Sequence, residues 1–520
     1  MNNAGSRRAP AGRDPPATLY WRDAIFATGG PGVLPAPVPL RAHGSRAIDT
    51  PTSPLDIYLV AIGGTGMAPL ACLLQELGHR VRGSDKALYP PMSDLLAEQG
   101  IEPLVGFDPG HLDPEPDLVV VGNAVPRSNP EVEEVERRGL PRISMPQALH
   151  RFCLRGRRPL VVAGTHGKTT TTSMAAWTWA DCGLAPGYLI GGRPRDLPRS
   201  FALGSGPRFC VEGDEYNAAY FDRGPKFLHY RPDTLVLTSV EYDHADLYPD
   251  SEVFVAAFER LVRGLGADGL LVACGDEPEV RALAAAAPCR VILYGLAPEH
   301  DVHPAGDPAA ERVVVRGPEG WTAELAMQVP GVHNLVNALG VWAAACADGI
   351  APQRAAAALS RFRGVARRLE ELGTAGGVTV VDDFAHHPTA VAASLRALRQ
   401  RHGGRRLVAL YEPRSLTAGR SFLHDAYREA FAVADVVGLP PVFYRDRLDD
   451  GDRLDLGRLA TELRARGVEV FLEPDVDALA AAARSRLRAG DVVVTMSSGS
   501  FEGLPRRLLE SLTVPLAKEP

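Results

Sequence analysis

Short apolar runs that end in a glycine-rich or polar turn and lead into a longer helical pattern recur along this chain. Residues 56–62 read Asp-Ile-Tyr-Leu-Val-Ala-Ile, residues 234–240 read Thr-Leu-Val-Leu-Thr-Ser-Val, and residues 491–496 read Asp-Val-Val-Val-Thr-Met. Runs of this length, rich in β-branched residues, are typical of buried strands. Strands that alternate with helices favour parallel sheets with helices on both faces. The pattern therefore predicts an α/β fold.

The chain is expected to divide into three domains. With 520 residues it is too long for a single hydrophobic core. The order of the patterns predicts a Rossmann-like domain at residues 54–150, a central phosphate-loop ATPase domain at 151–360 and a C-terminal doubly wound α/β domain at 361–512. Residues 1–53 are rich in Pro, Ala, Gly and Arg, which predicts a disordered extension or, equally, a mistaken start site. Residues 513–520 are expected to form a tail.

Composition narrows the functional classes. The chain is 45% hydrophobic and 23% charged with a formal net charge of -7, which argues against a general nucleic-acid-binding surface. No apolar run approaches the ~20 residues of a membrane-spanning helix. The cysteines form no Cys-x-x-Cys pair, so neither a disulfide framework nor a zinc site is indicated. We therefore expect a cytoplasmic protein without nucleic-acid or membrane partners.

The strongest functional signal is a glycine-bounded loop between an apolar run at 161–163 and a helical pattern. Its glycines let backbone N–H groups turn toward phosphate oxygens, and the helix N-terminus adds the positive end of its dipole. Lys168 is expected to face the β- and γ-phosphates, and the Thr169 hydroxyl is expected to bind Mg²⁺. One departure from the full Walker pattern is Val162, which stands in the place of the first glycine. The residues predicted to bind ATP here are Gly164, Thr165, His166, Gly167, Lys168, Thr169 and Thr170.

Acidic residues and a histidine at the ends of two further strands are candidate metal ligands. The apolar run at 208–211 ends in Glu212, and an acid at a strand end beside a phosphate loop is the usual position of a Mg²⁺ ligand. We favour Glu212, with Asp214 and Glu215 as second choices. His244 follows the next strand and could ligate a second metal ion. The predicted metal ligands are therefore Thr169, Glu212 and His244.

A glycine turn after the first strand is a weak signal for dinucleotide binding. Gly63-Gly64-Thr65-Gly66-Met67 opens a helix, and Asp85 closes the second strand close to the ~20 residues at which a ribose contact is expected. Taken alone, structural glycines of an α/β domain would explain this turn nearly as well.

Further motifs of the first domain carry a resemblance to a known family. The glycine turn together with Gly83-Ser84-Asp85, Tyr89-Pro90-Pro91-Met92-Ser93 and Val121-Gly122-Asn123-Ala124 resembles the UDP-binding domain of the Mur ligases that take UDP-N-acetylmuramate. The resemblance extends over residues 56–512. It implies that the first domain is a UDP-binding domain in which Gly63, Gly64, Gly66, Met67, Ser84 and Asp85 cradle the UDP moiety.

The same resemblance assigns roles to residues of the other two domains. It implies that His333, Asn334 and Asn337 lie beside adenine, whereas the spacing of the asparagines alone fits helix capping about as well. It also implies that Arg368 reaches the γ-phosphate and that Asp383 holds the ATP ribose. Two departures from the family pattern are Ser239, where Asn is usual, and the lack of a Lys at 247–260, where several relatives carry a carbamylated Lys.

Two turns of the third domain resemble the members of the family that attach a tripeptide. These turns are Tyr411-Glu412-Pro413-Arg414-Ser415 and Met496-Ser497-Ser498-Gly499-Ser500-Phe501. The implied reaction uses ATP and Mg²⁺ to phosphorylate the lactyl carboxylate of UDP-N-acetylmuramate. The amine of L-Ala-γ-D-Glu-meso-diaminopimelate then attacks the acyl phosphate, in peptidoglycan recycling. The alternatives are a ligase that adds L-alanine and, in another class, a nucleotide-dependent switch.

The residues expected to carry this chemistry can be named. Lys168, Glu212, His244 and Arg368 are predicted to be catalytic. Arg414 is predicted to bind a carboxylate of the peptide, because a planar guanidinium can donate two parallel hydrogen bonds and a Lys ammonium cannot.

Overall fold

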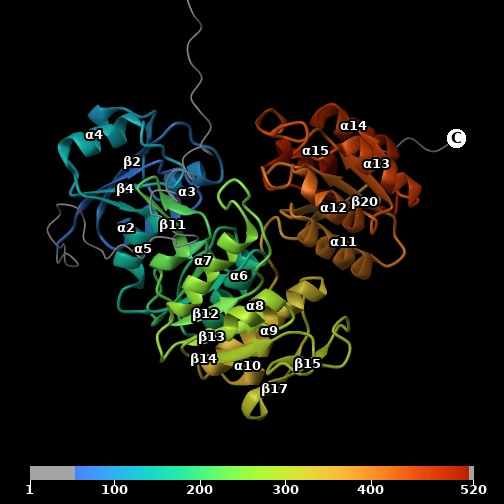
Figure 1. Ribbon diagram of the computed structural model, residues 1–520, viewed down its shortest axis with the longest axis horizontal. Coiled ribbons are helices and arrows are strands. Elements are labelled where there is room, and N and C mark those ends of the chain that lie inside the picture. The colour runs from blue at the N-terminus through green and yellow to red at the C-terminus, as the bar shows by residue number, and fades with distance from the viewer. Residues whose placement is uncertain (1–52, 514–520) are drawn as a thin grey trace, which may run out of the picture.

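The computed structural model describes residues 53–513, which form three domains in chain order (Figure 1). The predicted α/β class and the three-domain organisation are confirmed by five sheets, of which one large sheet lies in each domain. Apart from residues 53 and 513, the predicted N-terminal extension and C-terminal tail lie outside the described residues.

The first domain is a five-stranded parallel sheet in the order β3-β2-β1-β4-β5. The order reverses between β1 and β4, and open sheets of this kind bind ligands outside the carboxyl ends of the strands at such a point. The strands are β1 (Asp56–Val60), β2 (Arg80–Asp85), β3 (Leu104–Val105), β4 (Leu118–Val121) and β5 (Arg142–Ser144). The helices are α2 (Met67–Glu76), α3 (Met92–Glu98), α4 (Pro130–Arg138) and α5 (Met145–Leu149), with η1 (Pro109–Leu112) and η2 (His150–Leu154).

The central domain is a seven-stranded sheet in the order β14-β13-β12-β6-β9-β7-β8, in which only β8 is antiparallel. Its strands are β6 (Arg158–Ala163), β7 (Gly187–Leu189), β8 (Phe201–Ala202), β9 (Arg208–Gly213), β12 (Thr234–Leu237), β13 (Leu270–Cys274) and β14 (Arg290–Tyr294). Its helices are α6 (Lys168–Asp181), α7 (Ser251–Arg263), α8 (Pro278–Ala284), α9 (Val332–Ala347) and α10 (Pro352–Arg361).

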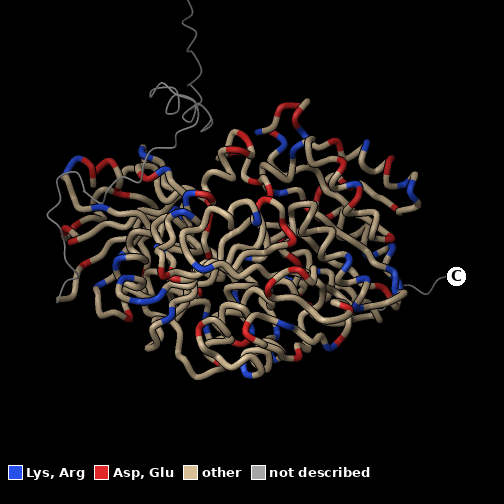
Figure 2. Tube along the Cα trace, turned by 60° about the horizontal axis from the view of Figure 1, so that its bottom comes forward, with Lys and Arg blue, Asp and Glu red and all other residues tan. Residues whose placement is uncertain are grey.

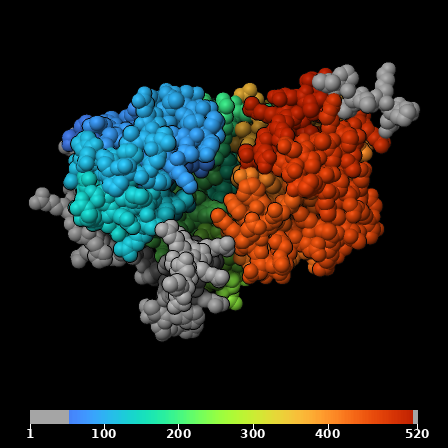
Figure 3. Space-filling view, turned by 90° about the horizontal axis from the view of Figure 1, so that it is seen from above, coloured from blue at the N-terminus to red at the C-terminus, as the bar shows by residue number. Residues whose placement is uncertain are grey.

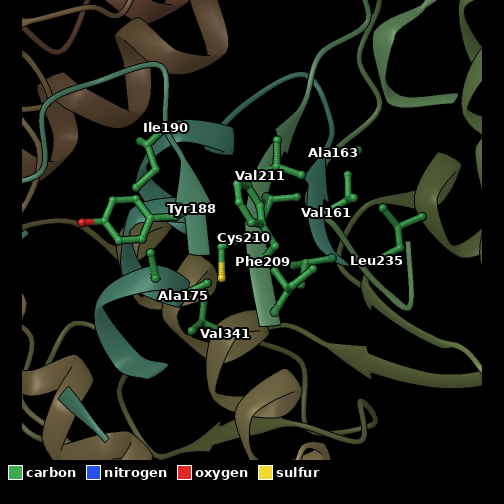
Figure 4. Packing of buried hydrophobic residues seen from close by; sticks show 14 of the residues in the cluster. Val161, Ala163, Ala175, Tyr188, Ile190, Phe209, Cys210, Val211, Leu235 and Val341 are labelled. Carbon is green, nitrogen blue, oxygen red and sulfur yellow. The ribbon is translucent and has the colours of Figure 1, made fainter. Parts of the chain in front are cut away.

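The core of the central domain surrounds β6, the strand that precedes the phosphate loop. Val161 and Ala163 pack beside Val211 of β9 and Leu235 of β12, and Val341 of α9 lies below them (Figure 4). Each fully buried Val or Leu side chain stabilises the fold by about 1.5–3 kcal/mol. The loop therefore projects from a rigid part of the domain.

The central domain also contains short antiparallel strands and single helical turns that the sequence patterns do not reveal. They are the sheet β15 (His303–Ala305), β16 (Val313–Arg316) and β17 (Thr322–Leu325), the hairpin β10 (Asn217–Ala219) and β11 (Asp222–Pro225), and the single turns η3 (Lys226–His229) and η4 (Pro318–Gly320).

The third domain is a six-stranded sheet in the order β18-β19-β23-β20-β21-β22, parallel except for β18. Its strands are β18 (Glu370–Ala375), β19 (Val378–Asp383), β20 (Leu407–Tyr411), β21 (Val436–Leu439), β22 (Glu469–Leu472) and β23 (Val492–Met496). Its helices are α11 (Pro388–His402), α12 (His424–Phe431), α13 (Leu456–Ala465), α14 (Val476–Arg486) and α15 (Leu504–Ser511), with η5 (Ser421–Leu423), η6 (Arg445–Arg447) and η7 (Phe501–Gly503).

Two predicted strands end earlier than their apolar runs. The run at 56–62 leaves the strand after Val60, because Ala61 has a left-handed backbone with φ 64°. The run at 234–240 leaves the strand after Leu237, because Thr238 and Ser239 turn to bond the phosphate loop. The apolar pattern thus follows burial at these positions, whereas backbone conformation or hydrogen bonding decides where each strand ends.

The first and third domains flank a groove whose floor is the central domain (Figure 3). The third domain contacts the central domain directly. The Thr389 hydroxyl donates to Glu241 (2.8 Å), the Ala245 N–H donates to the Thr417 hydroxyl (3.2 Å), and Gln400 donates to the carbonyl of Ala309 (2.8 Å). The central and third domains therefore meet through side chains along this boundary.

Lys and Arg residues are interspersed with Asp and Glu residues along the described part of the chain (Figure 2). Among residues 53–513, no helix is both long and apolar enough to cross a membrane.

Candidate active site

The loop between β6 and α6 has the backbone of a phosphate-binding turn. Gly164 has φ 132° and Gly167 has φ 79°, conformations that residues with a side chain rarely adopt. A Cβ atom at Gly164 would collide with Thr238, and one at Gly167 would collide with Asn337. The first N–H groups of α6 have no carbonyl partner within the helix. The loop therefore offers free N–H groups and the positive end of a helix dipole, which together favour phosphate.

Side chains at the end of β12 fasten this loop to the sheet. The Thr238 hydroxyl donates to the carbonyl of His166 (2.6 Å), and the Ser239 hydroxyl accepts from the N–H of His166 (3.0 Å). The Thr165 hydroxyl donates to the carbonyl of Glu241 (2.8 Å). Ser239 thus makes a hydrogen bond to the loop from the position where the family pattern has Asn.

Lys168 begins α6 and bridges the loop to a buried carboxylate. Its ammonium donates to the carbonyls of Gly164 (2.7 Å) and Thr165 (3.2 Å) and to Glu215 (2.9 Å). Burial by itself lowers the pKa of Lys168, but the Glu215 and Asp214 carboxylates outweigh it and raise that pKa. Lys168 is therefore held as a cation at the loop.

Thr169 and Glu212 come together from α6 and β9. The Thr169 hydroxyl donates to one carboxylate oxygen of Glu212 (2.8 Å), and the N–H of Gly191 donates to the other (2.6 Å). Burial raises the pKa of Glu212, although these two hydrogen bonds oppose the rise. A cation beside this carboxylate would favour its ionised form. Thr170, the next residue of α6, is buried.

The donor set suits Mg²⁺. Hydroxyl and carboxylate oxygens such as those of Thr169 and Glu212 are the ligands that this hard cation prefers. One oxygen of Glu215, Oε2, is buried without a hydrogen-bond partner, which a nearby cation would relieve. The residues present therefore fit a Mg²⁺ ion beside the phosphate loop.

His244 lies against Glu215 in a left-handed backbone conformation with φ 56°. Its Nε2 is 2.9 Å from Glu215 Oε1, and Asp243 is 4.0 Å away. Burial lowers the pKa of His244, but Glu215 and Asp243 together raise it to about 9. At neutral pH His244 is consequently an imidazolium ion-paired with Glu215. Its predicted role as a metal ligand requires loss of that proton.

Glu215, which the sequence places behind Glu212 as a candidate metal ligand, contacts both Lys168 and His244, and its side chain is 1% exposed. The sequence shows Glu215 only as one acid in a run at the end of β9, and this run does not reveal the partners of each acid.

The predicted adenine residues lie in the first turns of α9, next to the phosphate loop. Asn337 donates to the Asn334 side chain (3.5 Å), so the two amides share a face as their spacing indicates. Asn334 also donates to the carbonyl of Pro330 (2.7 Å). Burial lowers the pKa of His333 to about 4, which keeps its ring neutral. The adenine role of these residues stays a prediction.

Arg368 reaches the loop from the segment that connects the central and third domains. Its guanidinium is 3.4 Å from the Thr169 hydroxyl and lies over the ring of Phe384, 4.4 Å from the centroid. The neighbours Arg367 and Leu369 have left-handed backbones, with φ 59° and 51°. Residues with side chains adopt such values at a cost of about 1–3 kcal/mol each, often at functional sites. The predicted γ-phosphate role of Arg368 fits this position.

Asp383 is the last residue of β19 in the third domain. It is buried, accepts from the Ser394 hydroxyl (2.5 Å) and from the N–H of Ala385 (3.1 Å). Burial raises the pKa of Asp383 against the effect of these bonds. Its carboxylate is thus engaged with the protein, and a ribose contact would have to displace or share the Ser394 bond.

The predicted UDP residues lie at the carboxyl ends of β1 and β2. Asp85 accepts from the N–H of Gly63 (2.9 Å), and a side chain at Gly63 would collide with Leu88 and Asp85. Gly64, Gly66 and Met67 form the turn and the start of α2. Two side chains face inward, however: Met67 packs in the core, and the Ser84 hydroxyl donates to buried Glu131 (2.5 Å). Any contact of these two with UDP would therefore come from their backbone.

Arg414 follows β20 in the third domain. Its guanidinium lies 4.0 Å from the ring centroid of Phe443 and 3.4 Å from Glu412. A Cβ at Gly499 would overlap the Arg414 side chain, so the glycine leaves room for it. The guanidinium stays partly exposed, with 26% of the side chain accessible, and can still meet a ligand.

The central domain carries a phosphate-binding loop, and a Rossmann-like domain and a further α/β domain lie beside the same groove. This arrangement defines an enzyme that brings a nucleotide together with other substrates. Matches to known family models make this class more specific. Residues 56–157 match the model described as "Mur ligase family, catalytic domain". Residues 162–345 match the "Mur ligase middle domain", and residues 367–499 match the "Mur ligase, glutamate ligase domain".

Individual relatives extend over nearly the whole described chain. UDP-N-acetylmuramate--L-alanyl-gamma-D-glutamyl-meso-2,6-diaminoheptandioate ligase of Escherichia coli is 40% identical over 471 residues, which is 88% of this chain and 98% of that protein. A UDP-N-acetylmuramate--L-alanine ligase of Kineococcus radiotolerans is also 40% identical, over 88% of this chain and 96% of that protein. The crystal structure of a murein peptide ligase from Psychrobacter arcticus matches with a TM-score of 0.68 and 33% identity, covering 89% of this chain and 100% of that one.

The chain belongs to the Mur ligase family. It is thus an ATP-dependent ligase that forms carbon–nitrogen bonds.

Proposed function

We propose that this protein joins UDP-N-acetylmuramate to the tripeptide L-Ala-γ-D-Glu-meso-diaminopimelate, with conversion of ATP to ADP and phosphate. The reaction would return a peptide to peptidoglycan synthesis in the cytoplasm. The name of the Escherichia coli relative states this substrate pair and supports the proposal. The alignment with this chain covers 98% of that relative.

Arg414 is the observation that favours a peptide over a single amino acid. It lies after a strand end of the third domain, stacked on Phe443 and partly exposed. A tripeptide carries carboxylates beyond its reacting end, and a guanidinium fixed on an aromatic ring is preorganised to bind one of them. Because L-alanine has only its own carboxylate close to the reacting amine, it offers less to such a residue.

The central domain would carry out the phosphoryl transfer. Lys168, which now contacts Glu215, would move to the transferring phosphoryl group, and Arg368 approaches the same loop from the interdomain segment. Two fixed cations stabilise the charge on the equatorial oxygens of that group. Thr169 and Glu212 would hold Mg²⁺, which when bound supplies further positive charge at the phosphates.

The second step joins the peptide to the activated sugar. The tripeptide amine attacks the acyl phosphate at its carbonyl carbon, a tetrahedral intermediate forms, and its collapse releases phosphate and leaves an amide. The acyl phosphate must meet the amine before water does. Approach of the third domain to the groove would orient the amine and exclude water.

A ligase for L-alanine is the second candidate, because the Kineococcus radiotolerans relative is equally identical to this chain. Phosphate release and mass spectrometry of the UDP-linked product separate the two. The tripeptide should give ADP and the UDP-N-acetylmuramoyl-tripeptide. Turnover with L-alanine and none with the tripeptide would reject the proposal in favour of the second candidate.

A further inference from the structure

Three side chains from two domains meet beside the phosphate loop: His166 of the loop, Glu241 after β12, and His387 at the start of α11. The ring of His166 contacts Glu241 Oε2 through Nε2 at 2.7 Å. Nδ1 of His387 lies 3.7 Å from the same oxygen, and the two imidazole rings are 5.0 Å apart between centroids. One donor atom from each residue lies within 4.8 Å of the others.

His387 has no partner of its own in this arrangement. Its side chain is 4% exposed, and neither ring nitrogen makes a hydrogen bond. A buried imidazole without hydrogen bonds is destabilising, so its retention calls for an explanation. The 3.7 Å separation from Glu241 is too long for a hydrogen bond and leaves room for an atom that contacts both groups.

The charge states of the cluster suit a cation. Burial, followed by the nearby His166, lowers the pKa of His387 to about 4, so its ring is neutral and has a free lone pair at pH 7. Burial raises the pKa of Glu241, but the His166 bond and His387 outweigh it and lower that pKa. The Glu241 and Asp243 carboxylates act in the opposite direction and raise the pKa of His387, but burial outweighs them.

We propose that His166, Glu241 and His387 form a site for one divalent transition-metal ion of the Zn²⁺ class, separate from the predicted Mg²⁺ site at Thr169 and Glu212. Two imidazole nitrogens and one carboxylate oxygen are a donor set for Zn²⁺ and its neighbours rather than for Mg²⁺ or Ca²⁺. A water molecule would complete the coordination on the side of Glu241, whose side chain is 42% exposed and gives the ion a way in.

The ion would link the two domains. His166 and Glu241 belong to the central domain and His387 to the third, and the Thr389 hydroxyl already donates to Glu241 (2.8 Å) across the same boundary. Ligands from both sides bind only when the third domain is near the loop, so a bound ion stabilises that arrangement. Because His166 lies in the phosphate loop, the ion would also hold the loop.

Metal binding tests the site without any substrate, so its outcome does not depend on the proposed ligase reaction. Zn²⁺ retained after dialysis in excess Mg²⁺ is counted per chain, and Co²⁺ is used as a spectroscopic probe of imidazole ligation. His387→Gln, Glu241→Gln and His166→Gln should each lose one bound ion. The affinity should fall by more than the about 10- to 100-fold that supporting residues contribute.

A matched control removes a histidine of the other cluster of this kind within residues 53–513. His424→Gln breaks that cluster, in which His424 lies with Asp425 and Glu462. This control should keep the Co²⁺ signal. Loss of that signal in His424→Gln, or its survival in His387→Gln, would overturn the proposal. The Glu241 side chain is partly exposed, so Glu241→Gln should not disturb the fold and can serve as the test variant if His387→Gln fails to fold.

Small-angle X-ray scattering tests the link between domains. Zn²⁺ should reduce the radius of gyration of the wild-type chain and leave that of His387→Gln unchanged. A bound ion with no change in the wild-type radius or in its distribution of distances would show that the ion does not bring the domains together.

Discussion

Lys168 donates a 2.9 Å hydrogen bond to Glu215, and His244 contacts the same carboxylate oxygen at 2.9 Å. One buried anion therefore holds two cations, one on the phosphate loop and one after β12. A nucleotide that draws Lys168 to its phosphates would leave Glu215 to His244 or to a metal ion. The shared carboxylate thus couples the phosphate loop to the segment after β12.

Replacing Glu215 by Gln should lower the pKa of His244. Burial lowers this pKa, and the contact with Glu215 is the largest of the influences that raise it. Loss of the charge should therefore reduce the value of about 9 by more than about one unit. NMR titration of the His244 ring measures it, with Glu212→Gln as the control. A pKa that stays near 9 in Glu215→Gln would contradict the ion pair.

The stability of the protein should fall as the pH rises through the titration of His244. The folded-state pKa of about 9 exceeds the unfolded value of about 6.5, so the folded state binds the proton more tightly. The contribution is fully present below pH ~6.5 and is lost as the pH approaches 9, a change of at most about 3 kcal/mol. Urea unfolding across this range should show a steeper fall for the wild type than for His244→Gln. Parallel curves would refute the prediction.

Lys168→Ala should abolish ATP turnover and spare the UDP-sugar. Loss of a fixed cation at the phosphoryl group should reduce kcat by at least about 100-fold. The predicted UDP residues lie in another domain, so the Kd for UDP-N-acetylmuramate, measured by calorimetry, should stay within experimental error. Equal loss of both ligands would argue against their placement in separate domains.

Arg414→Lys should weaken the use of the tripeptide. Lys cannot form two parallel bonds to a carboxylate or stack on Phe443, and loss of a charge-assisted bond costs about 1.5–3 kcal/mol. The KM for tripeptide should rise about ten- to a hundredfold, with KM for ATP unaltered. Arg466→Lys, in a surface ion pair with Glu429, is the matched control. A rise in the KM for ATP instead would assign Arg414 to the nucleotide.

Gly499→Ala should reproduce part of that defect without touching Arg414. A Cβ there would overlap the Cδ, Nε and Cζ atoms of the Arg414 side chain. Because that side chain is flexible, the expected result is its displacement from Phe443, with a raised KM for tripeptide and a Tm close to that of the wild type. An unchanged KM together with a lowered Tm would show that Gly499 serves only packing.

Much of the fold and of the phosphate loop follows from the sequence, because both depend on contiguous residues. The strand before Gly164, the two glycines and the helix after Lys168 are set by local hydrophobicity and backbone freedom, and the structure has them at β6 and α6. The parallel sheets follow in the same way from strands that alternate with helices. The short antiparallel sheet β15 to β17 did not, because its strands are too brief to show a pattern.

Tertiary structure alone decided which polar groups meet. Glu212 lies near the end of β9, and Asp214 and Glu215 follow it; only the approach of Lys168 and His244 from other strand ends singles out Glu215. His387 lies far along the chain from His166, and the two rings approach only because the third domain packs against the central one. The direction of each side chain, such as Ser84 toward Glu131, depends likewise on packing between elements. Local patterns therefore predict elements and loops, whereas partners across elements arise from the whole fold.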